Sequence, residues 1–269
     1  MDHGLDFTDP HLIVWSVALP ILHIILVAYF REKSICSEKT SSGSRGSDIL
    51  ACNIVSTVCV SWCSVTGILG YLNISNAIDN MEIFNDKFYA KSLFVQNYVV
   101  TPMFCYQVWN LIACLIHNQF RTADAIGHHI VTGAVAYFAL RPFGHYYALF
   151  YAGISECSTI SLNFVSTFTD VPELSKKYPQ IFILSKIIFG CSYFIIRMVI
   201  WPILSIELWL GCRDLLVSGK AQSNVVVGFL MFANMFLTGL QLYWGYLLVK
   251  AAMPKKDKYP PGSKKMKDI

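Results

Sequence analysis

Seven long runs of apolar residues, separated by short polar segments, dominate this sequence. An α-helix needs about 20 consecutive apolar residues to cross the hydrocarbon core of a bilayer, because each residue advances it by about 1.5 Å. The fourth run is shorter, which indicates a helix that is tilted or buried within a bundle. The sequence therefore predicts an all-α fold, a polytopic transmembrane bundle of about seven spans. The expected spans are residues 12–30, 49–72, 94–116, 125–140, 146–168, 181–206 and 225–249.

The composition also argues against a soluble protein. Only 14% of the 269 residues are charged and 55% are hydrophobic, whereas about a quarter of the residues in a typical soluble domain are charged. The net charge is +4, but the basic residues lie at the ends of apolar runs and so indicate topology rather than nucleic-acid binding. We expect membrane lipids as partners and no nucleic acid, and the sequence leaves the oligomeric state open.

The distribution of Lys and Arg predicts which ends of the spans face the cytosol. If the N-terminus lies outside the cytosol, segments 31–48, 117–124, 169–180 and the C-terminal tail carry fourteen basic residues on the cytosolic side, against five on the far side. This excess follows the positive-inside rule and predicts a cytosolic C-terminus. The acidic leader argues against a cleaved signal peptide. If the first apolar run were nevertheless removed as a signal peptide, six spans would remain and the C-terminal tail would still lie in the cytosol.

Two adjacent histidines, His128 and His129, lie inside the fourth apolar run. An ionisable residue at membrane depth is costly and indicates a functional site. Neighbouring residues on a helix point about 100° apart, so we expect no metal ion to be gripped by this pair. One imidazole would instead act as base or nucleophile, and the other would orient a group or stabilise charge. The alternative is a pair that only packs helices together through hydrogen bonds.

Three further polar residues lie within later apolar runs. Glu156 and Asn163 are seven residues apart, and hence on one face of a helix, while Arg197 lies in the sixth run. Unpaired charges in hydrocarbon are too expensive to keep, so these side chains must pair or face a cavity. We expect a polar column through the bundle that binds a substrate, with a structural ion pair between Glu156 and Arg197 as the equally favoured alternative.

The order of these motifs resembles the TLC domain (TRAM, LAG1 and CLN8) family. The resemblance rests on the paired histidines, Glu-Cys-Ser-Thr at 156–159 followed by Asn163, Lys-Tyr-Pro at 177–179, and Phe-Ile-Ile-Arg at 194–197. It covers roughly residues 48–250 and is closest to the TLC-domain proteins outside the ceramide synthases. We accordingly divide the chain into residues 1–47 (lumenal N-terminus, first helix and cytosolic linker), a TLC domain at 48–250, and a basic cytosolic tail at 251–269.

The resemblance implies a fold, a location and a chemistry. It implies six helices around a lipid-accessible cavity, with one extra helix in front. In ceramide synthases, paired histidines and two later aspartates mark acyl transfer from acyl-CoA to a sphingoid amine. This sequence keeps the histidines but has Glu156, Ser158, Thr159, Ser161 and Asn163 where those enzymes carry Asp-x-x-Asp, and Thr101 and Pro102 near a further acidic position of relatives. These departures put ceramide synthesis itself in doubt.

Two features near the ends of spans bear on location. Lys265 and Lys267 lie fifth and third from the end, and they resemble a dilysine signal of endoplasmic reticulum proteins. A lysine-rich tail near anionic lipid has the same composition without being an address. Asn73-Ile74-Ser75 is a glycosylation sequon on the predicted lumenal side. We therefore expect a multi-pass protein of the endoplasmic reticulum, with glycosylation at Asn73 left open.

Two functional interpretations follow. In the first, the protein is a lipid acyltransferase in lipid metabolism or membrane lipid homeostasis, with His128 and His129 as catalytic residues and with Glu156, Asn163 and Arg197 binding substrate. Acyl-CoA would then be a co-substrate, and no cofactor would be bound. In the second, the same fold binds or senses lipid, or acts in trafficking, without chemistry. The paired histidines favour the first interpretation, whereas the missing aspartates favour the second for a ceramide reaction.

Overall fold

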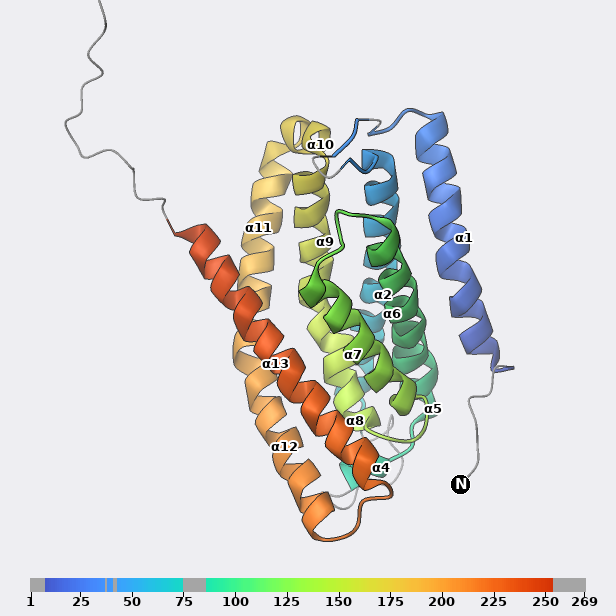
Figure 1. The fold of residues 1–269 in the computed structure, drawn as a ribbon, viewed down its shortest axis with the longest axis vertical. Coiled ribbons are helices and arrows are strands. Elements are labelled where there is room, and N and C mark those ends of the chain that lie inside the picture. The colour runs from blue at the N-terminus through green and yellow to red at the C-terminus, as the bar shows by residue number, and fades with distance from the viewer. Residues whose placement is uncertain (1–7, 37, 41–42, 75–85, 254–269) are drawn as a thin grey trace, which may run out of the picture.

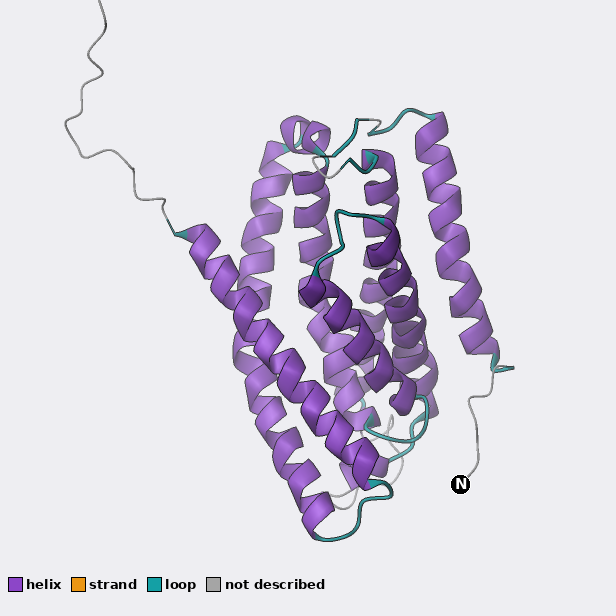
Figure 2. Ribbon diagram, viewed as in Figure 1, coloured by secondary structure: helices purple, strands orange, loops and turns teal. Residues whose placement is uncertain are grey.

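The computed structural model describes residues 8–36, 38–40, 43–74 and 86–253. All of the regular elements in these ranges are helices, as Figure 2 shows. The lysines of the expected dilysine signal and Ser75 of the sequon lie outside the described residues. The prediction of an all-α membrane bundle is confirmed.

Within the described residues, five helical segments are long and apolar enough to cross a membrane. They are α1 (Pro10–Glu32), α2 (Gly46–Leu72), the segment Leu93–Ile116, the segment Pro179–Val217, and α13 (Asn224–Ala252). Two further expected spans correspond to α7 (Ala123–Ala139), which has 17 residues, and to the continuous helical segment from His145 to Asp170. The short α7 lies across the face of the bundle in Figure 1, where neighbouring helices flank it.

Three of the long segments are not uniform α-helices. Leu93–Ile116 contains α5 (Leu93–Val95), the π-helix η1 (Gln96–Val100) and α6 (Thr101–Ile116). The segment from His145 contains α8 (His145–Ala148), the π-helix η2 (Leu149–Gly153), the 3₁₀ turn η3 (Ile154–Glu156) and α9 (Cys157–Asp170). Pro179–Val217 contains α11 (Pro179–Tyr193), the π-helix η4 (Phe194–Ile200) and α12 (Trp201–Val217). The short helices α4 (Asp86–Tyr89) and α10 (Pro172–Lys177) lie in connections.

The sixth helical segment is longer than the sequence predicted. We expected it to end at residue 206, but α12 continues to Val217. Pro202 lies in the first turn of α12, directly after the π-helix η4. Proline lacks a backbone N–H and disrupts regular helical hydrogen bonding, and the wider π turn accommodates it, so that the helix continues to an exposed end.

Helix α1 stands at the edge of the bundle. Only 11% of the residues in its most apolar window are buried, against 61% in α2. It packs against α2 and α6, as Figure 1 shows at the right of the molecule. This position agrees with the expectation of one extra helix in front of six.

A close backbone approach holds α2 against η2. A Cβ atom added at Gly67 would lie 2.6 Å from the Cα of Gly153 and 2.9 Å from the carbonyl oxygen of Leu149. These are backbone atoms, which cannot turn aside as a side chain does. The two glycines therefore set the distance between α2 and the segment that leads to Glu156.

We expect Gly67→Ala to destabilise the protein, because overpacking a tight contact costs about 1–3 kcal/mol. Unfolding in detergent–lipid micelles, followed by circular dichroism against SDS concentration, would measure the loss. Gly239→Ala is the matched control, since an added Cβ there meets no atom within 4 Å and alanine favours a helix by about 1 kcal/mol over glycine. Equal stability of the two variants would contradict the proposed contact.

Candidate functional site

The bundle encloses a cavity of about 560 Å³. Its lining residues come from α2, α6, α7, α9, α11 with η4, and α13, whereas α1 contributes none of them. They include residues near the starts of α2 and α7 and near the ends of α9 and α13. We call this space the polar chamber; it lies toward the end of the bundle at which α13 ends.

A second, smaller space adjoins the polar chamber. It has a volume of about 90 Å³ and is lined mostly by apolar side chains, among them Met103, Phe138 and Leu237. We call it the apolar chamber. Four residues line both chambers: Gln107, His128, Glu156 and Arg197. A polar belt thus separates a hydrophobic space from a more polar one, which suits a molecule with an apolar chain and a polar head.

The structure brings all five predicted site residues to the wall of the polar chamber. His128 and His129 come from α7, Glu156 from η3, Asn163 from α9 and Arg197 from η4. Their roles in binding or catalysis remain predictions. Their surroundings differ, however: the two histidines, the Glu156–Arg197 pair and Asn163 each make a separate set of contacts.

His129 is oriented by a glutamine from the neighbouring helix. Its Nδ1 lies 2.6 Å from Oε1 of Gln107 on α6. An amide oxygen can only accept, so Nδ1 carries the proton and Nε2 keeps its lone pair. Helix α7 begins immediately after Thr122, whose hydroxyl accepts a hydrogen bond from the Ala125 amide. This cap and the Gln107 contact together fix the ring at the chamber wall.

His128 has an aromatic environment instead. Its ring centroid lies 5.2 Å from that of His129 and 5.4 Å from that of Trp244, both in edge-on contacts. Trp244 in turn donates a hydrogen bond of 2.7 Å to Asp124. The His128 Nδ1 is buried and has no hydrogen-bond partner among the described residues. A buried polar atom of this kind requires an explanation.

Two more lining residues carry buried polar atoms of the same kind. The side-chain nitrogens of Asn53 and Gln241 have no partner within the described ranges, and both residues line the polar chamber. Amide nitrogens only donate. The residues around the chamber therefore include two buried donors without a partner in the described part of the chain.

Glu156 and Arg197 contact each other. The guanidinium Nη2 lies 3.4 Å from the Glu156 carboxylate, and both side chains are almost fully buried. Arg197 also donates to the hydroxyl of Ser158, to that of Thr159 and to the carbonyl of Ser155. The structural alternative for this pair, which the sequence left open, thus agrees with the geometry. Both partners belong to irregular turns, Glu156 to a 3₁₀ turn and Arg197 to a π-helix, and π-helical turns are frequent at functional sites.

Asn163 belongs to a separate network. Its amide donates to the hydroxyl of Ser56 at 2.9 Å, and this hydroxyl lies 2.7 Å from that of Tyr106. Asn110 also donates to Tyr106, at 3.1 Å. The expected polar column is therefore divided: Asn163 joins α9 to α2 and α6 rather than to the ion pair, and all four side chains line the polar chamber.

Sequence reasoning missed Gln107, Ser56, Tyr106 and Trp244. Gln107 offered a signal, because a polar amide within an apolar run follows the same argument that identified Glu156. Ser56, Tyr106 and Trp244 offered no such signal, since Ser, Tyr and Trp are ordinary residues of membrane helices and their facing positions depend on helix rotation.

We expect Glu156→Ala to lower the free energy of unfolding by about 3–5 kcal/mol, because it leaves the buried guanidinium without its counter-charge. The double variant Glu156→Ala/Arg197→Met should recover much of this loss. Asp214→Ala is the control: it breaks an exposed pair with Arg213, of which Asp214 is 53% exposed, and such pairs contribute less than about 1 kcal/mol. SDS unfolding curves would measure all three, and a loss for Glu156→Ala no larger than for the control would contradict the buried pair.

Comparison with known proteins agrees with this architecture. The model of the TLC domain family matches residues 54–250, a stretch that begins within α2 and ends near the end of α13. No curated protein matches the chain. The matched stretch contains the paired histidines, the Glu156–Arg197 pair and all of the residues that line the polar chamber except Cys52 and Asn53. The chain is a multi-pass membrane protein that belongs to the TLC domain family.

Proposed function

We propose that this protein acts in membrane lipid metabolism, by transferring an acyl group from acyl-CoA to a lipid acceptor in the polar chamber. The observation that carries the proposal is the position of His129: its ring forms part of the wall of a 560 Å³ cavity, and Gln107 fixes its proton on Nδ1. Ligand cavities in proteins commonly measure about 300–1,000 Å³ and combine apolar walls with a few directed polar groups.

The chemistry follows from the tautomer of His129. Its Nε2 accepts the proton of the acceptor's hydroxyl or amine as the oxygen or nitrogen bonds to the acyl carbon of the thioester. The carbon–sulfur bond then breaks, and the imidazolium returns the proton to the departing CoA thiolate. His128, the neighbouring ring, lies at the junction of the two chambers and supplies a polar contact to the reacting group.

The two chambers suit the two parts of a lipid. The apolar chamber receives hydrocarbon, and the donors of Asn53 and Gln241 face the oxygen atoms of a head group or of the thioester. The Glu156–Arg197 pair stands between the chambers, where its remaining acceptor sites on the carboxylate hold an amine or hydroxyl. We place the reaction in the endoplasmic reticulum with the C-terminus in the cytosol, which puts the polar chamber on the side from which acyl-CoA arrives.

We expect the double variant His128→Ala/His129→Ala to abolish acyl transfer. Protein reconstituted with membrane lipid extract would be incubated with isotopically labelled acyl-CoA, and labelled lipids would be measured by mass spectrometry. His11→Ala is the control, because His11 is on α1 and contacts Tyr98 rather than the chamber. Labelled product at the wild-type level from the double variant would overturn the catalytic role.

A second test addresses Gln107 as a positioning residue. Gln107→Leu removes the acceptor for the His129 Nδ1 proton. We therefore expect kcat to fall about tenfold or more, which is part of the roughly 10²–10⁴-fold that a positioned acid or base contributes, with little change in KM for acyl-CoA. Gln107→Glu keeps an acceptor at the same place and should restore much of kcat. Equal rates in both variants would show that the hydrogen bond does not position the base.

Lipid binding without chemistry is the second candidate function. It is favoured by the close contact between Glu156 and Arg197, in which each charged side chain already pairs with the other. Extraction and mass spectrometry of co-purified lipids would distinguish the two. The same unmodified lipid in wild type and in the double histidine variant, with no labelled product in either, would establish a lipid-binding or lipid-sensing protein.

A further inference from the structure

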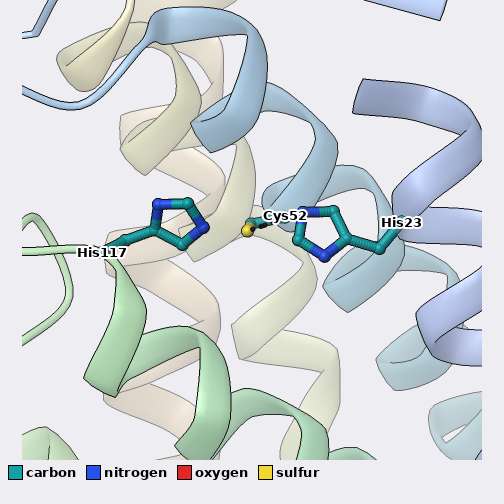
Figure 3. A group of neighbouring side chains, drawn as sticks. All are labelled: His23, Cys52 and His117. Carbon is teal, nitrogen blue, oxygen red and sulfur yellow. Dashed lines mark hydrogen bonds between the residues drawn. The ribbon is translucent and has the colours of Figure 1, made fainter. Parts of the chain in front are cut away.

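We propose that His23, Cys52 and His117 bind one Zn²⁺ ion that fastens α1 to the TLC domain. His23 lies in α1, Cys52 in the second turn of α2, and His117 directly after the last residue of α6. Within the described ranges these three form the one group of His, Cys, Asp and Glu side chains with the spacing of a metal site. Figure 3 shows the Cys52 sulfur between the two imidazole rings.

The distances are close to those of a zinc site. The three ligand atoms all lie within 4.8 Å of one another, and the Cys52 Sγ lies 3.4 Å from the His23 Nε2. Zinc bonds of about 2.0–2.3 Å in tetrahedral geometry place ligand atoms about 3.3–3.7 Å apart. One pair thus already has the required separation, and the others reach it by side-chain shifts of about 1 Å.

The neighbours of the two histidines hold their rings in place. His23 packs edge-on against Trp109 at 5.6 Å between ring centroids, and His117 packs edge-on against Phe120 at 6.2 Å. His117 directly follows α6, and its backbone is extended rather than helical. No further helical turn therefore packs against one side of its side chain. These aromatic contacts restrict the rotation of both rings.

The donor set selects the metal. Two imidazoles and one thiolate suit borderline and soft ions, whereas Ca²⁺ and Mg²⁺ take oxygen ligands. Three protein ligands leave a fourth tetrahedral position for water. The thiolate is the binding form of cysteine, so Zn²⁺ displaces the Cys52 proton to solvent.

A carboxylate lies close to the site without being a ligand. Asp48 lies four residues before Cys52, on the same face of α2, and it acts electrostatically on both His23 and His117. Both of its oxygens are held by Arg31, at 3.0 and 2.7 Å. The Arg31 guanidinium offsets this attraction, because it pairs with Asp48 and also acts electrostatically on His117. The case for a cation therefore rests on the geometry of the three ligand atoms.

A zinc ion at this site would strengthen the attachment of α1 to the rest of the bundle. This helix is the least buried of the five candidate spans. Among the described residues, the Arg31–Asp48 ion pair joins its C-terminal end to α2, and long hydrogen bonds of sulfur atoms also link it to α2 and α6. His23 and Cys52 lie before the stretch that matches the family, and His117 lies within it. A shared ion would tie the extra helix to the domain. Since Cys52 also lines the polar chamber, this attachment point lies beside the cavity.

The test is zinc content and affinity in the full-length protein. Protein purified in detergent and stripped with a chelator would be titrated with Zn²⁺ and then measured by inductively coupled plasma mass spectrometry after desalting. We expect about one ion per chain, with affinity at least tenfold weaker in His23→Gln, Cys52→Ser and His117→Gln. His11→Gln, on the same helix as His23, and Cys59→Ser, two turns along α2 from Cys52, should bind as the wild type does.

A second measurement does not depend on the folding of variants. Co²⁺ added to the stripped wild type should give the intense near-ultraviolet absorption of a thiolate–cobalt bond and the visible bands of a tetrahedral ion. Zn²⁺ should abolish both and raise the temperature of unfolding. Failure of the wild type to bind Zn²⁺, retention of Zn²⁺ by all three ligand variants, or selective retention of copper would overturn the assignment. Neither measurement depends on acyl-transfer activity. The zinc site and the proposed function are therefore tested independently.

Discussion

The organising constraint of this protein is that polar groups within a bilayer must find their partners inside the protein. Lipid tails offer no hydrogen bonds, and an unpaired charge among them is too costly to keep. The bundle satisfies this demand around a cavity: Arg197 is surrounded by one carboxylate and three oxygen atoms from the segment 155–159, and Asn163 is joined to two other helices through Ser56. The same networks that permit burial also join four helical segments at the polar chamber, namely 145–170, 179–217, α2 and α6.

Irregular helical turns place the charged pair. Glu156 ends a π-helix and 3₁₀ segment that begins directly after α8, and Arg197 lies in the middle of another π-helix. Each such turn rotates the following residues relative to a regular α-helix, because it changes the number of residues per turn. The close contact of Gly67 with Gly153 lies just before η3, so backbone packing against α2 and side-chain pairing with Arg197 act on the same short segment. Distorted backbone and buried charge thus support one another here.

Hydropathy sufficed to predict the helical class and the approximate limits of α1, α2 and α13, because a span in lipid needs a length of apolar chain that is visible in sequence. The identity of the cavity-lining residues was predictable only where an ionisable or amide side chain interrupted an apolar run, as for His128, Glu156 and Arg197. Ser56 and Tyr106 could not be found in this way, because their position depends on helix rotation. The extension of α12 to Val217 was missed because the apolar run stops at Ile206 and the following stretch carries Glu207, Arg213 and Asp214, so hydropathy alone does not reveal that the helix continues.

The same reasoning explains why the proposed zinc ligands are not recognisable as a site in the sequence but lie together in the structure. His23, Cys52 and His117 are separated by 29 and 65 residues, so no ligand spacing of the usual short kind relates them. They meet because α1 and α2 run in opposite directions, as do α2 and α6. The end of α6 and the start of α2 therefore lie at the level of the second half of α1. Each helix contributes one ligand, so an ion at this point restrains three elements at once. Helix α1 gains most from such a restraint, since it is the least buried of the five candidate spans and lipid competes for the same surface.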